Sequence, residues 1–356
     1  MTATRDQRRT VPAEDGPAGV GGVPGLFEMM LAYKRTALLS TGVELGVFDA
    51  LGRGPASAAQ VADACGLDPR GGRLLLNALA GLGLLTVADG TYALGPAAAA
   101  HLVRDRPGYV GDMTRVMSST WEWDALKSLP DAVRRGGTVL DQHAETPEYQ
   151  YWQDFAAFAG AVAGPTAERA AAALDAWAGD RPRLRVLDMA CGHGLYGFTL
   201  ARHQPRAEVW SLDWDTVLPV TRKHGERLGV ADRAHIIAGD MFTVPLGGPY
   251  DVVMITNVLH HFSEDRGVEL IRRAAEVTAP GGRIVLVGFT VDEDRPPHLD
   301  PEPHLFSILM LIWTFDGEVH SVDAYRRMLA AGGFGPPEVV TVPSLPLRVL
   351  IAERLR

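Results

Sequence analysis

The second half of the chain contains five short runs rich in β-branched residues, and helical segments separate them. The runs are LRVLDMA, AEVWSLDW, AHIIAGD, YDVVMITNV and GRIVLVGF, starting near residue 183. Strands that alternate with helices predict an α/β fold, a mostly parallel sheet with helices on both faces. The tail PEVVTVPSLPLRVLIAERLR adds two more strands at the end of that sheet. In such sheets a ligand binds outside the carboxyl ends of the strands, near the point where the strand order reverses.

A second pattern lies in the segment SAAQVADACGLDPRGGRLLLNALAGLGLLTVADGTYALGP. Ser57 suits the N-cap of a first helix, Gly66 suits its end, and Asp68-Pro69 suits the start of a second helix. LLTVADGTYAL then predicts two short strands joined at Asp89-Gly90, which is a hairpin signal. Helix, turn, helix and hairpin together predict a winged helix within residues 24–107.

Other segments complete the predicted domain organisation. LFEMMLAYKRTALLSTGVELGVFDALG has apolar residues at three- and four-residue spacing, which predicts a buried amphipathic helix and a shorter one. Residues 1–23 are polar and rich in Gly and Pro, so we expect a disordered leader. Residues 108–178 are expected to be a helical linker that walls a substrate pocket, with Trp152 and Phe155 as candidates. Core packing between domains accounts for these aromatic side chains equally well.

A winged helix invites comparison with DNA-binding proteins, but charge argues against that function. The formal net charge is −9, and the second helix offers Arg70 and Arg73 among apolar or small residues. A helix that reads DNA presents polar side chains to base edges and basic ones to phosphates. We therefore expect no nucleic-acid partner and a helix that packs against protein.

Three features bear on location. Cys65 and Cys191 are the only cysteines, too few for a disulfide framework, which fits a reducing compartment. No apolar run approaches the ~20 residues that span a bilayer. The start MTATRDQRRT lacks the apolar core of a signal peptide. We expect a cytoplasmic protein with no membrane partner.

Polar residues follow the predicted strands in a consistent order. The first strand leads into VLDMACGHGLYG, a glycine-rich turn that would let a ligand approach the backbone, although dinucleotide-binding enzymes use a similar turn. Asp213 ends the second strand, about twenty residues beyond, where a carboxylate can accept hydrogen bonds from ribose hydroxyls. Asp240 and Met241 follow the third strand, where an acid can accept an adenine amino proton and a thioether can pack against the ring.

In order and spacing, these signals over residues 183–356 resemble a class I S-adenosylmethionine-dependent methyltransferase. With the winged helix in front, nearly the whole chain is similar to the caffeate O-methyltransferase-like family. The resemblance implies a Rossmann-like catalytic domain over residues 179–356 with a seven-stranded sheet, S-adenosylmethionine as cofactor, and a small-molecule acceptor in specialised metabolism. It also implies a homodimer formed through the winged helix. The cofactor-binding positions implied are Asp188, Gly192, Gly194, Asp213, Trp214, Asp240, Met241 and Asn257.

One position of the glycine-rich turn departs from the family. Ala190 stands where the family has glycine, two residues after the first acid. Alanine permits a tight turn at negative φ, so we expect a modest change in loop shape.

The stretch TNVLHHFSED follows the fourth strand, and His260 in it matches the family's general base. A reference pKa of ~6.5 leaves an imidazole largely neutral near pH 7, ready to take a proton from a phenol, a hydroxyl or a carbon acid. His320 and Glu318 lie near the family's glutamate that orients the base. Either residue would hold His260 in one tautomer by a hydrogen bond.

His261 is a second departure, because the family has an acid there. It could be an exposed residue at a helix start, a wall of the acceptor pocket, or, with His260 and His304, a ligand of a divalent transition metal or iron. Such a metal would stabilise the enolate of a 2-oxo acid, so that its β-carbon would be methylated. A cofactor-binding relative that does not methylate is a further alternative. Met310 and Trp313, on the predicted helix HLFSILMLIWTF, are expected as pocket walls or as core.

Overall fold

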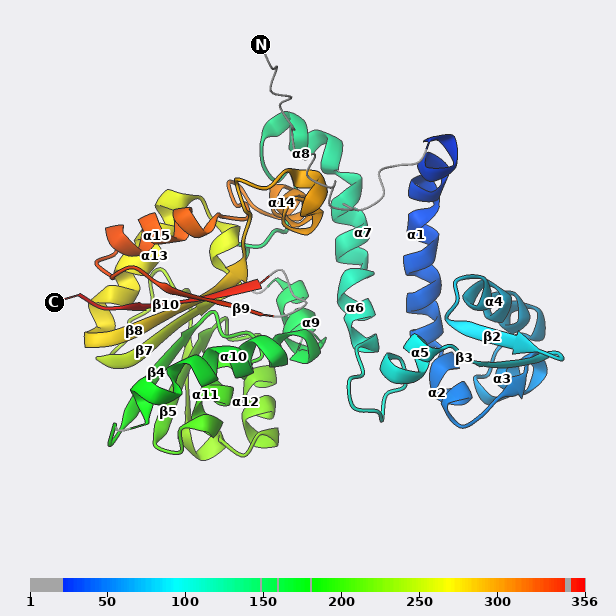
Figure 1. Ribbon diagram of the computed structural model, residues 1–356, viewed down its shortest axis with the longest axis horizontal. Helices are drawn as coiled ribbons and strands as arrows, with labels where there is room; N and C mark the ends of the chain where they lie inside the picture. The colour runs from blue at the N-terminus through cyan, green and yellow to red at the C-terminus, as the bar shows by residue number, and fades with distance from the viewer. Residues whose placement is uncertain (1–21, 148, 159, 180, 343–346, 356) are drawn as a thin grey trace, which may run out of the picture.

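The computed structural model describes residues 22–147, 149–158, 160–179, 181–342 and 347–355. A small N-terminal region and a larger region built on a sheet stand on either side of a column of short helices (Figure 1). Most of the predicted leader, residues 1–23, lies outside the described residues. Its last two residues begin the first helix, so the helix starts earlier than the sequence predicts.

The predicted helix, turn, helix and hairpin are present in the N-terminal region. Ser57 is the N-cap of the first helix and forms a capping box with Gln60, and the Asp68 side chain accepts hydrogen bonds from two backbone N–H groups of the second helix. The two hairpin strands pair antiparallel. The elements are α1 (Gly22–Glu44), α2 (Val47–Gly52), β1 (Ala56–Ser57), α3 (Ala58–Ala64), α4 (Pro69–Gly81), β2 (Leu85–Ala88), β3 (Thr91–Leu94) and α5 (Pro96–His101).

Helix α1 differs from the expected buried helix. Only Gly42 and Val43, at its C-terminal end, are buried. Large apolar side chains along the rest of the helix are exposed within one chain: Val23, Leu26, Phe27, Met29, Met30, Leu31 and Tyr33. These residues recur at spacings of one to three along the helix, so they cover a broad side of α1. A helix of this kind leaves a large apolar surface uncovered in the monomer.

The segment between the two regions is helical, as predicted. Its aromatic side chains form an apolar cluster with a later helix, α14 (Pro301–Trp313), to which Tyr149, Tyr151 and Trp313 contribute. The linking helices are α6 (Thr114–Met117), α7 (Thr120–Lys127), α8 (Leu129–Arg135), α9 (Gln150–Phe158) and α10 (Gly160–Ala178).

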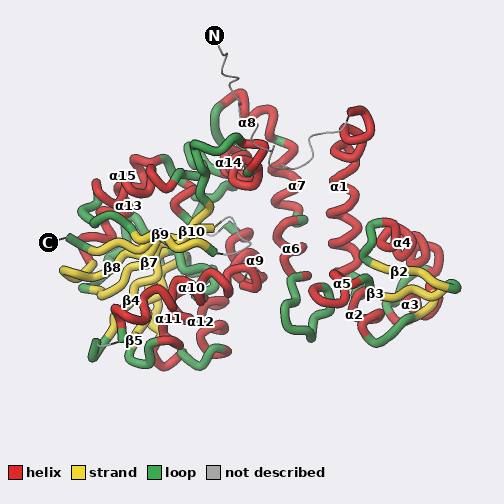
Figure 2. Tube along the Cα trace, viewed as in Figure 1, coloured by secondary structure: helices red, strands yellow, loops and turns green. Residues whose placement is uncertain are grey.

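The larger region is a seven-stranded sheet covered by helices on both faces (Figure 2). Its strands are β4 (Leu184–Met189), β5 (Ala207–Asp213), β6 (Ala234–Ala238), β7 (Tyr250–Thr256), β8 (Thr278–Phe289), β9 (Glu338–Thr341) and β10 (Leu347–Glu353). They lie in the order β6-β5-β4-β7-β8-β10-β9. The pairs among β4 to β8 are parallel, and β10 pairs antiparallel with both neighbours. The predicted α/β class and strand number are confirmed.

The sheet order determines where a ligand can bind. The chain moves outward from β4 to β6 and then returns to place β7 on the other side of β4, so the order reverses between β4 and β7. The crossover helices are α11 (Leu195–His203), α12 (Leu218–Arg227) and α13 (Glu264–Val277), and α15 (Val322–Ala331) packs beside α13. Among the described helices, none is long and apolar enough to cross a membrane.

Candidate active site

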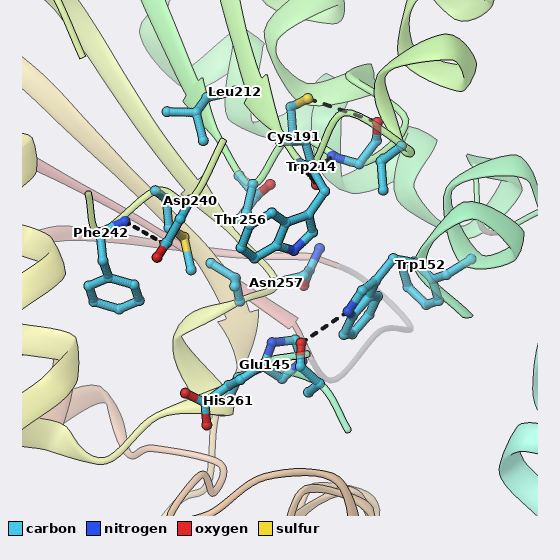
Figure 3. Close-up of a pocket in the computed structure, with 18 of the residues that line it drawn as sticks. Glu145, Trp152, Cys191, Leu212, Trp214, Asp240, Phe242, Thr256, Asn257 and His261 are labelled. Atoms are coloured by element: carbon cyan, nitrogen blue, oxygen red, sulfur yellow. Dashed lines mark hydrogen bonds between the residues drawn. The ribbon is translucent and has the colours of Figure 1, made fainter. Parts of the chain in front are cut away.

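A cavity of about 210 Å³ opens at the carboxyl ends of β4, β5, β6 and β7, where the order of the strands reverses. Figure 3 shows side chains from these strand ends on one side of it and residues of the helical linker on the other. Six of the predicted cofactor-binding residues line it: Gly192, Asp213, Trp214, Asp240, Met241 and Asn257. Three predicted acceptor-side residues also line it: Trp152, Phe155 and His261.

Asp213 connects two of the strand ends. It is the last residue of β5, and its carboxylate accepts the backbone N–H of Gly192 at 2.7 Å and that of Trp214 at 2.7 Å. Burial raises the pKa of Asp213 to about 6, although these two hydrogen bonds favour the ionised form. Each carboxylate oxygen can accept a further hydrogen bond, so Asp213 can hold the glycine-rich turn and a ligand hydroxyl at once.

Asp188 and Gly194 are predicted cofactor-binding residues that do not line this cavity. Asp188 is fully buried at the end of β4, and its Oδ2 accepts the backbone N–H of Gly197 in the first turn of α11 at 3.1 Å. Gly194 has φ 73° at the N-cap of α11, and a Cβ there would meet Phe198 at 2.4 Å. Both residues therefore hold the turn in place without lining the cavity. Asp188 does so by its hydrogen bond to Gly197, and Gly194 by leaving room for Phe198.

The far end of the cavity is formed after β6 and β7. The Asp240 carboxylate accepts the N–H of Phe242 at 2.8 Å. Asn257 takes a left-handed φ of 54° and donates from Nδ2 to the Tyr196 hydroxyl at 3.0 Å. Its Oδ1 is buried and has no hydrogen-bond partner within the described part of the chain. An acceptor that lacks a partner is suited to a donor group of a ligand.

The histidine pair lies in a short 3-10 helix, Leu259–His261, directly after β7. Both side chains are buried, so His261 is not an exposed residue at a helix start, and α13 begins three residues later. The two rings are nearly perpendicular with centroids 4.7 Å apart, and the ring of His261 lies 5.2 Å from that of Trp152. Burial lowers the pKa of His261 to about 4. Burial, with the neighbouring His261 and His320, lowers the pKa of His260 well below its usual value. Both imidazoles are therefore neutral at pH 7.

Neither residue predicted to orient His260 forms a hydrogen bond to it. The Nε2 of His320 lies 2.9 Å from the backbone carbonyl oxygen of Phe262, which fixes the imidazole against the chain. Glu318 is exposed to solvent. The prediction was wrong because the segment before α15 carries Glu318 outward and turns the His320 ring towards Phe262.

Two residues of α14 were expected as walls of the acceptor pocket or as core, and the structure places them in the core. Met310 and Trp313 are buried in the aromatic cluster of the linker, and the ring centroids of Trp313 and Tyr151 are 4.4 Å apart. Neither lines the cavity. The helical spacing of apolar residues in α14 reflects packing against the linker helices.

Comparisons with known proteins agree with this geometry. Residues 170–335 match the family described as O-methyltransferase domain, and residues 27–104 match the O-methyltransferase dimerisation domain. Mouse acetylserotonin O-methyltransferase is 30% identical over 332 residues, which cover 87% of this chain and 83% of that one. The tetracenomycin polyketide synthesis 8-O-methyl transferase of Streptomyces glaucescens is 29% identical over 323 residues, covering 88% and 92% of the two chains.

The chain belongs to the O-methyltransferase family.

Solved structures of O-methyltransferases share the fold along nearly the whole chain. A Nostoc punctiforme protein assigned to these enzymes is 31% identical, with a TM-score of 0.86 over 92% of this chain and 98% of that one. Human N-acetylserotonin methyltransferase, solved in complex with S-adenosylmethionine, has a TM-score of 0.80 over 98% of this chain and 100% of its own, at 22% identity. The protein is an O-methyltransferase, and neither C-methylation nor loss of methyl transfer finds support in these relatives.

The alternative of a metal site in this O-methyltransferase is not supported. No group of three or more His, Cys, Asp or Glu side chains that could hold a metal ion occurs among the described residues. His304 lies in the first turn of α14, while His260 packs against Phe306 of the same helix with ring centroids 4.9 Å apart. The aromatic ring occupies the side of His260 that faces α14, so the three histidines do not converge on one point.

Sequence reasoning missed several residues that line the cavity of the O-methyltransferase. Tyr196 lies in the first turn of α11 but within the glycine-rich stretch VLDMACGHGLYG, so its position could have been predicted. Arg266 lies in the first turn of α13, and its guanidinium packs over the ring of Phe242 at 4.1 Å. Glu145 comes from the loop before α9, and burial raises the pKa of its carboxyl group. No pattern in the sequence points to Glu145, because only the tertiary fold brings that loop to the strand ends.

The expected negative φ at Ala190 is wrong. The residue has φ 53°, a left-handed conformation that costs an alanine about 1 kcal/mol. We expect Ala190→Gly to raise the melting temperature of the ligand-free O-methyltransferase by roughly 2 °C, measured by calorimetry. Gly192 also has φ 53°, with open space where a Cβ would lie, so Gly192→Ala is the matched control and should lower the melting temperature. A lower melting temperature for Ala190→Gly would contradict the strain argument.

Proposed function

We propose that this enzyme transfers the methyl group of S-adenosylmethionine to a hydroxyl group of a planar aromatic metabolite, with His260 as general base. The observation that carries the proposal is the continuous cavity from the ends of β4, β5 and β6 to the His261 and Trp152 side chains. Relatives named for action on 3-hydroxy-5-methyl-1-naphthoate and for tetracenomycin synthesis support an aromatic acceptor.

The strand ends fit the proposed cofactor. A ligand can approach the backbone of Gly192 closely, because no atom of a described residue beyond its chain neighbours lies within 4 Å of the position that a Cβ would occupy there. Asp213 would accept hydrogen bonds from ribose hydroxyls, Asp240 from the adenine amino group, and Met241 would pack against the ring. Asn257 presents the unpartnered Oδ1 to a donor group. When bound, S-adenosylmethionine supplies a methyl group on a positively charged sulfur, which a nucleophilic oxygen can attack.

On the acceptor side, the chain needs to align a hydroxyl and remove its proton. His261 lines the cavity, and His260 beside it does not. We assign removal of the proton to Nε2 of His260, because its buried imidazole is neutral and its ring centroid lies 4.7 Å from that of His261. Trp152 and Phe155 of α9 would stack against the aromatic acceptor, and the ring of His261 would fix its orientation beside Trp152. These side chains would also exclude water from the reacting oxygen.

A direct assay tests the proposed activity. The purified enzyme with S-adenosylmethionine and a set of hydroxylated naphthoates, anthraquinones and indoles should form S-adenosylhomocysteine together with an acceptor that has gained one methyl group on oxygen. Mass spectrometry and NMR of the product identify the methylated atom. Methylation at carbon or nitrogen, with none at oxygen, would contradict the proposal.

The raised pKa of Asp213 predicts a pH-dependent cofactor affinity. Above about pH 6 the carboxylate is ionised and accepts hydroxyl hydrogen bonds, and protonation at lower pH removes that capacity. One hydrogen bond to a charged group is worth about 1.5 kcal/mol, so we expect the Kd for S-adenosylmethionine to rise roughly tenfold between about pH 8 and about pH 5. Calorimetric titration measures it. The matched control Asp213→Asn should bind weakly at every pH, and the same pH dependence in this variant would assign the effect to another group.

We further infer a division into a winged helix at residues 24–107, a linker at 108–178 and a catalytic domain at 179–356. The separate apolar core of the first segment supports the first boundary, whereas Ala163 to Ala178 of α10 share the apolar core of the sheet. A homodimer formed through the first segment would cover the exposed apolar side chains of α1. We propose a cytoplasmic location, since Cys65 and Cys191 are both free thiols.

A further inference from the structure

Two buried polar atoms, one on the proposed base and one beside it, lack hydrogen-bond partners in the described part of the chain. They are Nδ1 of His260 and the hydroxyl oxygen of Tyr325. Tyr325 lies in the first turn of α15 and is 1% exposed, and His260 is 3% exposed. An unsatisfied buried polar atom costs about 1–3 kcal/mol, so two in one place call for a physical explanation.

Both atoms border the same small space. It lies above Gly288 in β8, the strand that is hydrogen-bonded to β7. A Cβ built on Gly288 would lie 3.0 Å from the Tyr325 hydroxyl oxygen and 3.9 Å from Nδ1 of His260. A side chain at this position would crowd both groups, and glycine leaves the position beside them open.

The other neighbours of His260 do not compete for its Nδ1. Phe306 and Phe289 present aromatic rings at 4.9 and 6.4 Å from the imidazole centroid. His261 packs perpendicular to His260 and lines the cavity. His320 places Nε2 against the carbonyl oxygen of Phe262. The Tyr325 hydroxyl is therefore the unpartnered polar group, among described residues, that borders the same space as Nδ1.

We propose that Tyr325 is a positioning residue for His260. Its hydroxyl oxygen accepts a hydrogen bond from the Nδ1–H group of His260, directly or through one water molecule beside Gly288. The proposal rests on the assignment of His260 as general base. With the proton held on Nδ1, the lone pair of the neutral imidazole is on Nε2, which is the atom that must accept the acceptor's hydroxyl proton. Without Tyr325, the imidazole can adopt the other tautomer, in which Nε2 cannot accept a proton.

The first test is Tyr325→Phe, which removes one oxygen atom from a buried ring. We expect kcat to fall about tenfold while the KM for acceptor and for S-adenosylmethionine stays within twofold of wild type, as for loss of a group that orients a base. Tyr250→Phe is the matched control. Tyr250 is equally buried, and its hydroxyl donates to the carbonyl oxygen of Leu246 at 2.6 Å, on a strand of the same sheet. The control should lose stability without losing kcat.

A second variant tests the shared space without altering Tyr325. Gly288→Ala places a Cβ within 3.0 Å of the hydroxyl and should lower kcat by a similar factor. If both changes break one contact, the double variant Tyr325→Phe/Gly288→Ala should be no slower than the slower single variant. Effects that multiply would overturn the proposal, as would a Tyr325→Phe enzyme with kcat within twofold of wild type.

The variant His260→Ala separates this inference from the function on which it rests. If His260→Ala is inactive and Tyr325→Phe is fully active, His260 remains the base and the positioning role of Tyr325 is wrong. If His260→Ala retains wild-type kcat, the assignment of the base fails, and the inference about Tyr325 fails with it.

Discussion

Replacing His260 with alanine is expected to lower kcat about a thousandfold, within the range of about 10²–10⁴ that general base catalysis contributes. The buried imidazole of His260 is neutral at pH 7, because burial and two neighbouring histidines lower its pKa. Its loss would leave the acceptor hydroxyl protonated when it meets the methyl donor. Initial rates of S-adenosylhomocysteine formation at saturating concentrations of both substrates measure the effect.

His261→Ala provides the control for this prediction. The His261 ring lines the cavity beside Trp152, so its loss should mainly raise the KM for the acceptor, with a smaller change in kcat. Circular dichroism and the Kd for S-adenosylmethionine should stay unchanged in His260→Ala if the fold is intact. An active His260→Ala enzyme together with an inactive His261→Ala enzyme would transfer the role of base to His261.

Substituting two exposed apolar residues of α1 is expected to convert the proposed dimer into monomers. Phe27 and Met30 are 57% and 62% exposed within one chain, and they lie one turn apart. Burial of a large apolar side chain contributes about 1.5–3 kcal/mol, and each substitution acts twice in a symmetric dimer. We expect Phe27→Asp/Met30→Asp to raise the dimer Kd by at least about a thousandfold, measured by sedimentation equilibrium.

Lys34→Asp is the matched control for charge. It changes the net charge by as much as the double substitution and lies on the same helix, but it removes no apolar side chain. This control should remain dimeric at concentrations where the double variant is monomeric. A double variant that sediments like the wild type would show that α1 is not part of the interface.

The sequence predicted most of the fold because its local signals agree with one another. Ser57 and Asp68 cap the helices that they were expected to start, and the strands from residue 184 onward pair in the predicted sheet. Caps and strand periodicity depend on residues close in sequence, so a single chain is enough to recognise them. The acids at the ends of β5 and β6 could be predicted for the same reason, since strand ends define the ligand side of a parallel sheet.

Predictions failed where a role depends on which way a side chain points. For Met310 and Trp313 the sequence left pocket wall and core open, and the packing of α14 against the linker decided for the core. Glu318 and His320 lie two residues apart, and neither forms a hydrogen bond to His260, because Glu318 points into solvent and the Nε2 of His320 lies against the carbonyl of Phe262. At Ala190, residue type favours a negative φ, while the geometry of the turn imposes φ 53°.

The sequence by itself therefore determined the α/β class, the winged helix, the family resemblance and the residues at the strand ends, since all of these follow from local pattern and spacing. Tertiary structure alone decided what surrounds the base. Tyr325 and Gly288 are far from His260 in the chain, and only the pairing of β8 with β7 and the packing of α15 bring them to one buried space. A hydrogen bond requires atoms within about 3 Å of each other, and spacing along a chain does not report such distances for residues on different elements.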